Sequence, residues 1–311
     1  MYIANSNNCW FTNVGEAFID IGVKNIIHNL KEKHNDIQYG TISPMTNYYI
    51  GDICGDNSPA FNNTINICDW FMPDLLIMPG MYLTSEMVNN LNGMGERDTA
   101  VNIKKKGGKV AFLGAGGYKY DEEERRNVIK FMDEIQPAFV ITRDKKTYDM
   151  YKDYVECKRG LDCAFWVNDS FNPKNMTCNK YVVSTFNRSD EPYEVQNLDN
   201  LIHPWHMQYY LNIKKTKFLA KRNIMVSDSP YEYLTLYANA DKVYTDLVHA
   251  TIPSLVYGTP VKYYRIDNRR DAFESIPYLE YDEQGFMSIN LKKLEENKKE
   301  IELYIDKCLY K

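Results

Sequence analysis

Short apolar runs alternate along this chain with longer amphipathic stretches, and this alternation constrains the fold more than any other feature. Each run is bounded by polar residues, Gly or Pro, which is typical of a buried strand. Strands that alternate with helices favour a parallel sheet, because a parallel pair needs a crossover connection. The predicted strands are residues 75–78, 109–113, 139–142, 181–184, 224–226, 242–245 and 260–264. The sequence therefore predicts an α/β fold.

The amphipathic stretches have the spacing of helices with one apolar face. Between residues 14 and 30, Val, Ala, Phe, Ile and Leu recur on one side of a predicted helix. A second helix is expected to end near residue 135 and to begin with the acidic residues at 121–124, which suit the positive end of a helix dipole. A third, charged helix is expected at 291–308, with packing as its role.

The length of 311 residues predicts two domains, because single cores tend to divide above about 250 to 300 residues. We place the boundary near residue 156, within about ten residues, so the expected domains are 1–156 and 157–311. Residues 186–206, rich in Asn, Asp and Pro, are expected to form a long irregular insertion. Loops of that length often carry function.

The charge balance argues against a general polyanion-binding protein. The chain has 37 Lys and Arg against 42 Asp and Glu, a net charge of −5, so nucleic acid is not an expected partner, although a local basic pocket for a small anion is compatible. No run of about 18 apolar residues occurs, so no membrane span is expected and the expected location is the cytosol. The seven cysteines contain no C-x-x-C pair and are expected to be reduced and structural.

A glycine-rich turn, Gly114-Ala115-Gly116-Gly117, lies between a predicted strand and an acidic-headed helix. Backbone N–H groups at such a position can bind a phosphate or a carboxylate. The spacing does not match the dinucleotide-binding fingerprint, and a plain tight turn is the alternative interpretation.

Charged side chains follow three of the predicted strands. Arg143 is interpreted either as a surface ion pair with Asp144 or as an anion clamp, because a guanidinium can bind carboxylate or phosphate through two hydrogen bonds. We expect its replacement to weaken binding more than folding, because a charge at a cleft adds little core packing. His249 begins an apolar helix and is either a core histidine or a functional group. Arg269 and Arg270 follow another strand, where a solvated turn is the alternative.

Two histidines flank Pro204 and Trp205 in the segment His203-Pro204-Trp205-His206. Their spacing suggests a metal pair, but no cluster of Cys or His accompanies them, so no metal is expected. An aromatic wall for a sugar is the preferred interpretation of Trp205.

In order and spacing, these motifs resemble those of the polysaccharide pyruvyl transferase family from about residue 13 to 273. An Asn-x-Gly-acid motif stands at 13–16, a strand-end Arg-Asp pair at 143–144, and residues 245–250 are similar to a Thr-x-Arg-x-His-Ala pattern. The other matching motifs are Pro79-Gly80, the turn at 114–117, Asp162-Cys163-Ala164-Phe165, the Gly-x-Pro-Val strand at 258–261 and the segment 267–273.

The chain departs from the family pattern at several positions. Leu247 stands where the family usually has an Arg, which removes one cation unless Arg188 or Arg270 compensates. Glu16 replaces an Asp, Cys163 replaces a Pro, and Arg269 replaces a Lys with its charge kept.

The resemblance implies a GT-B-like architecture, with two Rossmann-like domains, a central cleft and a closing C-terminal helix. It implies phosphoenolpyruvate as the donor, no cofactor, and transfer of its enolpyruvyl group to a hydroxyl pair of a saccharide, free or lipid-linked. The product would be a pyruvate ketal in a surface polysaccharide or glycan, made in the cytoplasm or at the inner membrane face.

The resemblance also implies site residues. Several cations are expected because phosphoenolpyruvate is a compact trianion near neutral pH. His249 is expected to stabilise the phosphate or donate a proton, and Glu16 to act as the base or orient the acceptor, although these roles can be exchanged. The implied catalytic residues are His249, Glu16 and Arg143, the donor-binding residues are Arg143, His249, Arg269, Gly116 and Gly117, and the acceptor-binding residues are Asn13, Trp205 and Arg188.

Two alternatives stay open at this point. A glycosyltransferase that uses a nucleotide sugar would have the same architecture, because fold does not determine function. A non-catalytic saccharide-binding relative is the other alternative, and Leu247 is the residue that argues for it.

Overall fold

A computed structural model describes residues 1–6, 13–42, 72–89, 96–176, 180–206, 223–265 and 268–310. The chain separates into two compact units, each built on its own sheet. The first unit comprises Met1–Asn8, Ile26–Asp162 and Ile301–Lys311, and the second comprises Cys9–Asn25 and Cys163–Glu300. Neither unit is one continuous segment. The domain boundary expected near residue 156 stays a prediction.

The sheet of the first unit has six parallel strands in the order β2-β1-β3-β4-β5-β6. The strands are β1 (Tyr2–Ser6), β2 (Gln38–Ile42), β3 (Leu75–Pro79), β4 (Lys109–Ala115), β5 (Val140–Thr142) and β6 (Cys157–Arg159). The helices that contribute to this unit are α1 (Gly15–Lys31), α4 (Ser85–Val88), α5 (Glu96–Lys105), α6 (Glu122–Ile135), α7 (Lys145–Tyr151) and α13 (Leu291–Leu309).

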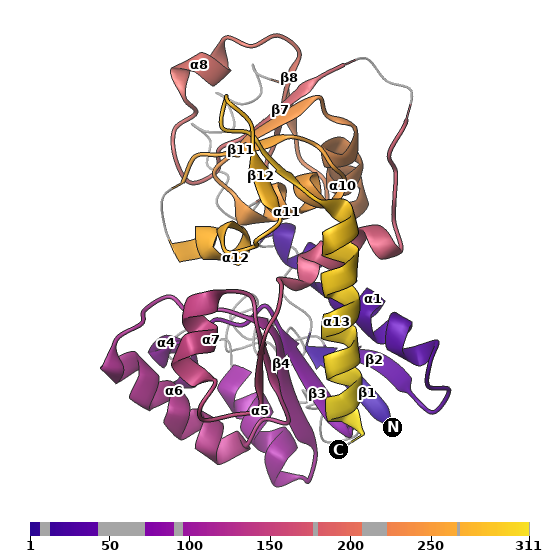
Figure 1. Ribbon diagram of the computed structural model, residues 1–311, viewed down its shortest axis with the longest axis vertical. Helices are drawn as coiled ribbons and strands as arrows, with labels where there is room; N and C mark the ends of the chain where they lie inside the picture. The colour runs from indigo at the N-terminus through magenta and orange to yellow at the C-terminus, as the bar shows by residue number, and fades with distance from the viewer. Residues whose placement is uncertain are drawn as a thin grey trace, which may run out of the picture. The chain divides into compact units, whose positions relative to one another are not determined.

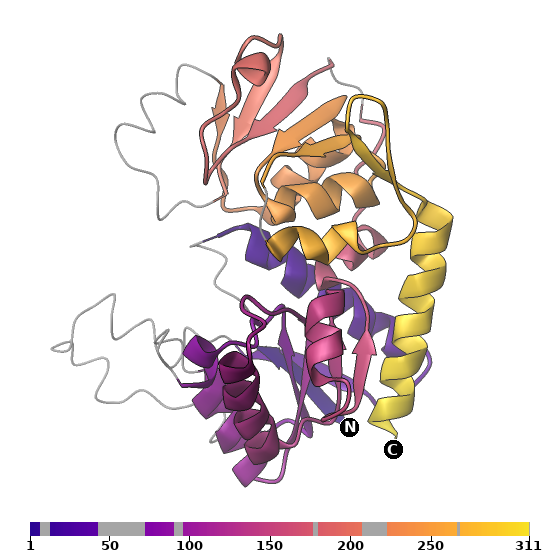
Figure 2. The same cartoon turned by 60° about the vertical axis from the view of Figure 1, so that its left-hand side comes forward.

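The central strands of this sheet are apolar because helices cover both of their faces. Every residue of β3 is buried, as expected for parallel strands between two helical layers. Side chains of α4, α5 and α6 pack on one face against Leu76, Met78, Val110 and Phe112. The end of α13 lies on the other face, as Figures 1 and 2 show.

The sheet of the second unit has seven strands in the order β12-β13-β11-β10-β7-β8-β9. The strands from β11 to β9 are parallel, and β12 and β13 add an antiparallel edge. The strands are β7 (Val182–Thr185), β8 (Leu201–Pro204), β9 (Ile224–Met225), β10 (Lys242–Thr245), β11 (Val261–Tyr263), β12 (Leu279–Tyr281) and β13 (Met287–Ile289). The helices are η2 (Cys163–Asp169), α8 (Tyr193–Gln196), α10 (Pro230–Asn239), α11 (Val248–Val256), η4 (Asn268–Arg270) and α12 (Asp271–Glu274).

All seven strands predicted from apolar runs are present, as β3, β4, β5, β7, β9, β10 and β11. The predicted irregular insertion at 186–206 is wrong in part, because it contains α8 and β8, and β8 pairs with both β7 and β9. The sequence of β8, Leu-Ile-His-Pro, lacks the apolar signal of the other central strands.

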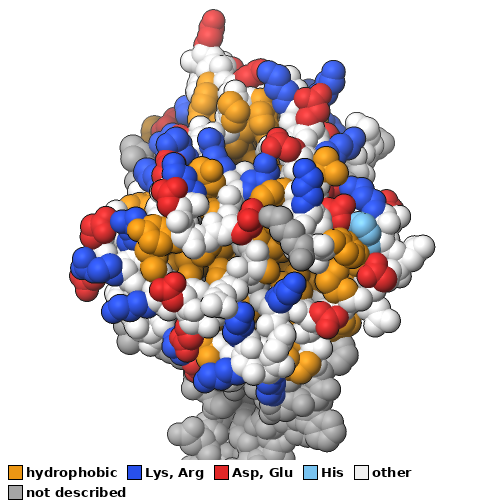
Figure 3. Space-filling model, turned by 60° about the horizontal axis from the view of Figure 1, so that its bottom comes forward, with side chains coloured by type: hydrophobic (Ala, Val, Ile, Leu, Met, Phe, Trp, Pro, Cys, Tyr) orange, Lys and Arg blue, Asp and Glu red, His pale blue; other side chains and the backbone are white. Residues whose placement is uncertain are grey.

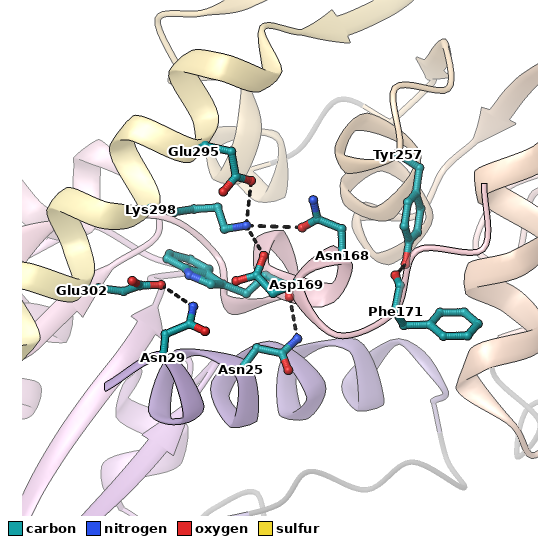
Figure 4. Close-up of polar contacts among 10 residues, drawn as sticks. Asn25, Asn29, Asn168, Asp169, Phe171, Tyr257, Glu295, Lys298 and Glu302 are labelled. Carbon is teal, nitrogen blue, oxygen red and sulfur yellow. Dashed lines mark hydrogen bonds and ion pairs between the residues drawn. The ribbon is translucent and has the colours of Figure 1, made fainter. Parts of the chain in front are cut away.

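Helix α13 is tied to η2 in the second unit through a buried lysine. Nζ of Lys298 donates to Asn168 Oδ1 at 3.3 Å, to Glu295 Oε1 at 2.9 Å and to Asp169, as Figure 4 shows. The ammonium also lies 5.8 Å from the centre of the Trp166 ring. Each of the three N–H groups of Lys298 therefore has an acceptor among the described residues.

Surface charge is mixed on the face shown in Figure 3, where Lys and Arg lie among Asp, Glu and apolar side chains. The cysteines Cys157, Cys163 and Cys308 are free thiols, and burial raises the pKa of Cys157 to about 12. Across the described ranges, no helix has the length and apolar character needed to cross a membrane.

Candidate active site

Arg143 follows β5 and is buried at the carboxyl end of the first sheet. Its backbone N–H donates to the carbonyl of Ala115, the last residue of β4, at 2.8 Å. Its Nη1 donates to Oδ2 of Asp162 at 3.1 Å, and its Cζ lies 4.5 Å from the centre of the Tyr82 ring. Arg143 is 8% exposed and Asp162 is fully buried. The side chain therefore forms a buried ion pair against an aromatic face.

Gly116 provides the space in which the guanidinium lies. A Cβ at this position would be 2.6 Å from Nε and 3.0 Å from Nη2 of Arg143, so any side chain would have to displace it. The backbone of Gly116 is itself fixed, because its N–H donates to Met81 and its carbonyl accepts from Leu83. The glycine-rich turn therefore packs directly against Arg143.

Arg143 has hydrogen-bonding capacity that its described neighbours do not use. A guanidinium has five N–H donors, and within the described ranges its side chain makes one hydrogen bond, to Asp162. Burial opposes the charge, but Tyr82, Asp162 and Asp144 outweigh burial and raise the pKa of Arg143 above its usual value. A permanent cation with unused donors is the chemistry that binds phosphate and carboxylate groups.

Asp144 has a different role from the one that a surface ion pair would give it. Its carboxylate caps α7 by accepting from the backbone N–H of Thr147 at 2.7 Å and from the Thr147 hydroxyl at 2.8 Å. The interpretation of Arg143 as a surface partner of Asp144 is therefore wrong. The buried ion pair also argues against a small effect of Arg143 on folding, because its removal would leave Asp162 buried without its partner.

In the second unit, Asn13 and Glu16 form a cap at the start of α1. Asn13 Oδ1 accepts from the N–H of Gly15 at 3.1 Å, and Asn13 Nδ2 donates to Glu16 Oε1 at 3.1 Å. The Asn13 carbonyl also accepts from the N–H of Glu16 at 3.0 Å. This arrangement is similar to a capping box, with an acidic group at the positive end of the helix. The motif at 13–16 therefore fixes the Glu16 carboxylate in place.

His249 lies directly against this cap. A Cβ at Gly15 would be 2.0 Å from Nδ1 and 2.4 Å from Cγ of the His249 ring. His249 is in the first turn of α11, just after β10. Glycine at position 15 is therefore what allows α1 and α11 to approach, and the second unit alone brings together the 13–16 motif and His249.

Asp246 anchors the loop that carries Arg188. Its carboxylate accepts from the backbone N–H groups of Asn187 at 3.1 Å, Arg188 at 2.9 Å and Ser189 at 2.6 Å. Asp246 is almost fully buried, whereas Arg188 is exposed. The next residue, Leu247, is buried and precedes α11. Arg188 is thus held on the loop beside the position where the family cation is missing.

The two histidines of the 203–206 segment belong to different networks. His203 Nε2 lies 2.9 Å from Glu191 Oε1, and His206 Nε2 lies 2.5 Å from the Tyr237 hydroxyl. Within the described ranges, no three His, Cys, Asp or Glu side chains are grouped as a metal ion would require.

Trp205 is only 3% exposed. Its N–H donates to Met225 and its carbonyl accepts from the Tyr233 hydroxyl at 2.8 Å, so its backbone is fixed beside β9 and α10. Arg269 is half-buried in η4. Arg270 pairs with Glu274, its Nε donating to Oε1 at 2.6 Å.

The site residues thus form two groups. Gly116, Gly117 and Arg143 belong to the first unit, and the 13–16 motif, His249, Arg188 and Arg269 belong to the second. Their convergence on one cleft stays a prediction, as do their roles.

Several residues at these positions were given no site role from the sequence. Asp162, Tyr82, Asp246 and His206 contact or orient the predicted residues, but no periodicity links them to their partners. One signal was available for Asp162, which directly precedes the apolar run Cys163-Ala164-Phe165-Trp166. A carboxylate next to a buried run needs a cationic partner, so Asp162 could have been predicted to pair with an Arg or a Lys.

Several known structures have a fold similar to that of this chain. UDP-GlcNAc 2-epimerase from Neisseria meningitidis bound to UDP-GlcNAc is 11% identical, with a TM-score of 0.53 over 87% of this chain and 84% of that one. An S. aureus MnaA–UDP structure is 12% identical, with a TM-score of 0.55 over 96% and 87%. UDP-GlcNAc 2-epimerase from Methanocaldococcus jannaschii is 12% identical, with a TM-score of 0.53 over 95% and 90%. At this identity the likeness shows the fold alone, which is GT-B-like with two Rossmann-like domains.

At the sequence level, no curated protein matches the chain. The sequence profile of the polysaccharide pyruvyl transferase family, in contrast, matches residues 13–268. This range includes Arg143 and His249, and Arg269 lies just beyond its end. The chain therefore belongs to the polysaccharide pyruvyl transferase family, which is a family of transferases.

Proposed function

We propose that this protein transfers the enolpyruvyl group of phosphoenolpyruvate to a hydroxyl pair of a saccharide and forms a pyruvate ketal. Family membership supports a transferase that acts on a saccharide. The identity of the donor and the formation of the ketal are the parts that we propose. We also propose that the reaction takes place in the cytoplasm or at the inner membrane face, on a free or lipid-linked acceptor.

The observation that carries the proposal is the state of Arg143. Its charge is held by Asp162 and Tyr82, while the donors over Gly116 make no hydrogen bond to any described residue. A compact anion that carries both phosphate and carboxylate is the type of ligand that such a guanidinium binds through two hydrogen bonds. We assign Gly116 and Gly117 to the same donor site, because Gly116 packs directly against the Arg143 guanidinium and Gly117 follows it in the same turn.

The second group supplies the acid, the base and further cations. We propose that His249 stabilises the phosphate and donates a proton, and that Glu16 acts as the base or orients the acceptor, with these two roles exchangeable. Arg269 is proposed as a further donor-binding cation. Asn13, Trp205 and Arg188 are proposed to contact the acceptor, and for Trp205 this requires its nearly buried ring to become accessible.

The reaction is balanced without any co-reactant. A proton adds to the methylene carbon of phosphoenolpyruvate, which makes C2 cationic, and a saccharide hydroxyl attacks C2 while losing its proton to the base. The C2–O bond to phosphate then breaks, and the second hydroxyl attacks C2 and loses its proton. One hydroxyl proton replaces the proton used at the methylene carbon, and the other leaves with phosphate. General acid–base catalysis of this kind typically contributes about a hundredfold to ten-thousandfold in rate.

The experiment is an incubation of the protein with phosphoenolpyruvate and a panel of saccharides. We expect phosphate release that depends on the saccharide, together with a new ketal methyl signal by NMR. Arg143→Lys is the matched variant, because it keeps the charge and loses the fork, and it should raise the KM for phosphoenolpyruvate about tenfold. Binding of a nucleotide sugar by calorimetry, without turnover of phosphoenolpyruvate, would refute the proposal in favour of a glycosyltransferase.

A further inference from the structure

His206 is a buried histidine that the proposed chemistry has not yet used. Its backbone N–H donates to Asn187 Oδ1 at 2.8 Å, and its carbonyl accepts from the N–H of Val14 at 3.0 Å. The residue is therefore held between the loop after β7 and the start of α1. The His249 ring packs on Gly15, the residue that follows Val14, and so lies close to this backbone contact.

The imidazole ring of His206 is enclosed by aromatic side chains. Ring centres of Phe18, Tyr233 and Tyr237 lie 5.9, 5.1 and 5.8 Å away. The ring is fully buried, and its Nε2 lies 2.5 Å from the Tyr237 hydroxyl. Among the described residues, its Nδ1 has no hydrogen-bond partner. A buried polar atom without a partner is rare and requires an explanation.

The tautomer of His206 follows from Tyr237. Burial raises the pKa of Tyr237 well above its usual value, so the phenol keeps its proton. Two groups interact with this hydroxyl: Nε2 of His206 at 2.5 Å, and the Thr185 side chain, which lowers the pKa of Tyr237. A hydroxyl that lowers the pKa of a phenol acts as a donor to its oxygen, which leaves the phenol proton for Nε2 of His206. A neutral imidazole that accepts at Nε2 carries its own proton on Nδ1. The unpartnered atom is therefore an N–H donor.

His206 also stays neutral. Burial first, and the neighbouring His249 second, lower its pKa from 6.5 to about 3. His206 is therefore neutral over the pH range in which an unperturbed imidazole titrates. A protonated His249 has two N–H donors and no acceptor. It therefore cannot accept a hydrogen bond from the Nδ1–H of His206, which agrees with the absence of a partner for that group among the described residues.

We propose that His206 is a positioning residue for His249: its Nδ1–H, directed by the Tyr237 hydrogen bond at Nε2, donates to the His249 imidazole once that ring has given up a proton. The inference rests on the proposed role of His249 as proton donor. In that step the proton moves from His249 to the methylene carbon, and the nitrogen of His249 that loses it becomes an acceptor. The new hydrogen bond stabilises the neutral ring and keeps it oriented for reprotonation.

Two substitutions separate this role from a structural one. The amide of His206→Asn has an N–H near the position of Nδ1 but loses the Tyr237 contact, whereas the amide of His206→Gln reaches toward Tyr237 and loses the donor at Nδ1. We expect His206→Gln to lower kcat about tenfold to a hundredfold with the KM for phosphoenolpyruvate little changed, and His206→Asn to retain most of kcat. A purely structural role predicts the reverse order, with activity following the thermal midpoint, and that result would overturn the proposal.

NMR of ¹⁵N-labelled histidine in the wild-type protein tests the same inference without activity. We expect His206 to show the Nδ1–H tautomer and no titration between about pH 5 and pH 8. An Nε2–H tautomer would overturn the proposal, whether or not phosphoenolpyruvate is turned over. A Nδ1–H tautomer in a protein that does not use phosphoenolpyruvate would instead refute the proposed function and leave the buried donor established.

Discussion

Two buried cations, Arg143 and Lys298, have similar surroundings but different hydrogen bonding. Both are at most 8% exposed, both pair with an aspartate and both lie near an aromatic ring. Lys298 has three N–H donors and three described acceptors, Asn168, Asp169 and Glu295. Arg143 has five N–H donors and one described hydrogen bond.

This difference indicates what identifies a binding residue. Burial and pairing are shared by both cations, so neither property separates a ligand-binding side chain from a structural one. Unused donors separate the two residues, because all three N–H groups of Lys298 already bind protein acceptors, whereas Arg143 keeps N–H groups for the ligand that we propose. Each prediction below tests this distinction, beginning with the largest expected effect.

The first prediction concerns removal of Arg143. Arg143→Ala leaves Asp162 charged and buried, so we expect the free energy of unfolding to fall by about 3 to 5 kcal/mol and use of the donor to be lost. Arg143→Ala combined with Asp162→Ala should recover much of the stability but none of the activity. Urea denaturation and steady-state rates measure both effects. Recovery of activity in the double variant would show that Arg143 serves only to balance Asp162.

The second prediction concerns Lys298, the saturated cation. Lys298→Met should lower the free energy of unfolding by about 2 to 3 kcal/mol, less than for Arg143 because Asp169 and Glu295 are partly exposed. The folded variant should keep kcat and KM. Lys299→Met changes an exposed neighbour on the same helix and should leave stability within experimental error. A loss of turnover in Lys298→Met at a temperature where it is fully folded would contradict the comparison.

A third prediction concerns His206, a buried nitrogen that stays uncharged. Because its pKa in the folded protein is about 3, below its ordinary value of 6.5, the unfolded chain binds a proton that the folded chain excludes. This contribution to stability is complete above pH 6.5 and is lost as the pH falls toward 3. Between pH 7 and pH 5 the wild type should lose about 2 kcal/mol more than His206→Gln. Parallel pH profiles for the two proteins would show that His206 is protonated in the folded state.

The fourth prediction, with the smallest expected effect, concerns Gly116, which packs against the unused N–H groups of Arg143. In Gly116→Ala, the new Cβ would lie 2.6 Å from Arg143 Nε, so the guanidinium must shift and phosphoenolpyruvate should bind about tenfold more weakly. Gly160→Ala is the matched control, because its Cβ would crowd the Ile141 side chain at 2.4 Å at the end of β6. Calorimetric titration should separate the two variants, and equal affinities would place the ligand away from Gly116.

The sequence predicted the strands that contain short apolar runs. β3 and β4 lie at the centre of their sheet and read as continuous apolar runs. β2, with the sequence Gln-Tyr-Gly-Thr-Ile, is an edge strand and has no such run. The signal thus followed the apolar runs and not the place of a strand in its sheet, because the interior strands β1 and β8 were missed and the edge strand β9 was predicted.

The candidate site was predictable only in part, for a related reason. The place of Arg143 follows from the rule that parallel strands present ligand sites at their carboxyl ends. Its partner Asp162 lies beyond β6 and is brought back by the tertiary fold. The same holds for Gly15 and His249, whose close approach depends on the packing of α1 against α11. Contacts between residues so far apart in the chain cannot be predicted from the spacing of residues in the sequence.

Helices α1 and α13 are each divided between the two units, so the units cannot be separated by one cut in the chain. Residues 15–25 of α1 belong to the second unit and residues 26–31 to the first, while α13 passes from the second unit back to the first at residue 301. A gene segment that ends at Asp162 would carry the start of α1 without its partners and would lack the end of α13. A single crossover at Asp162 would therefore separate the start of α1 and the end of α13 from the units in which they pack.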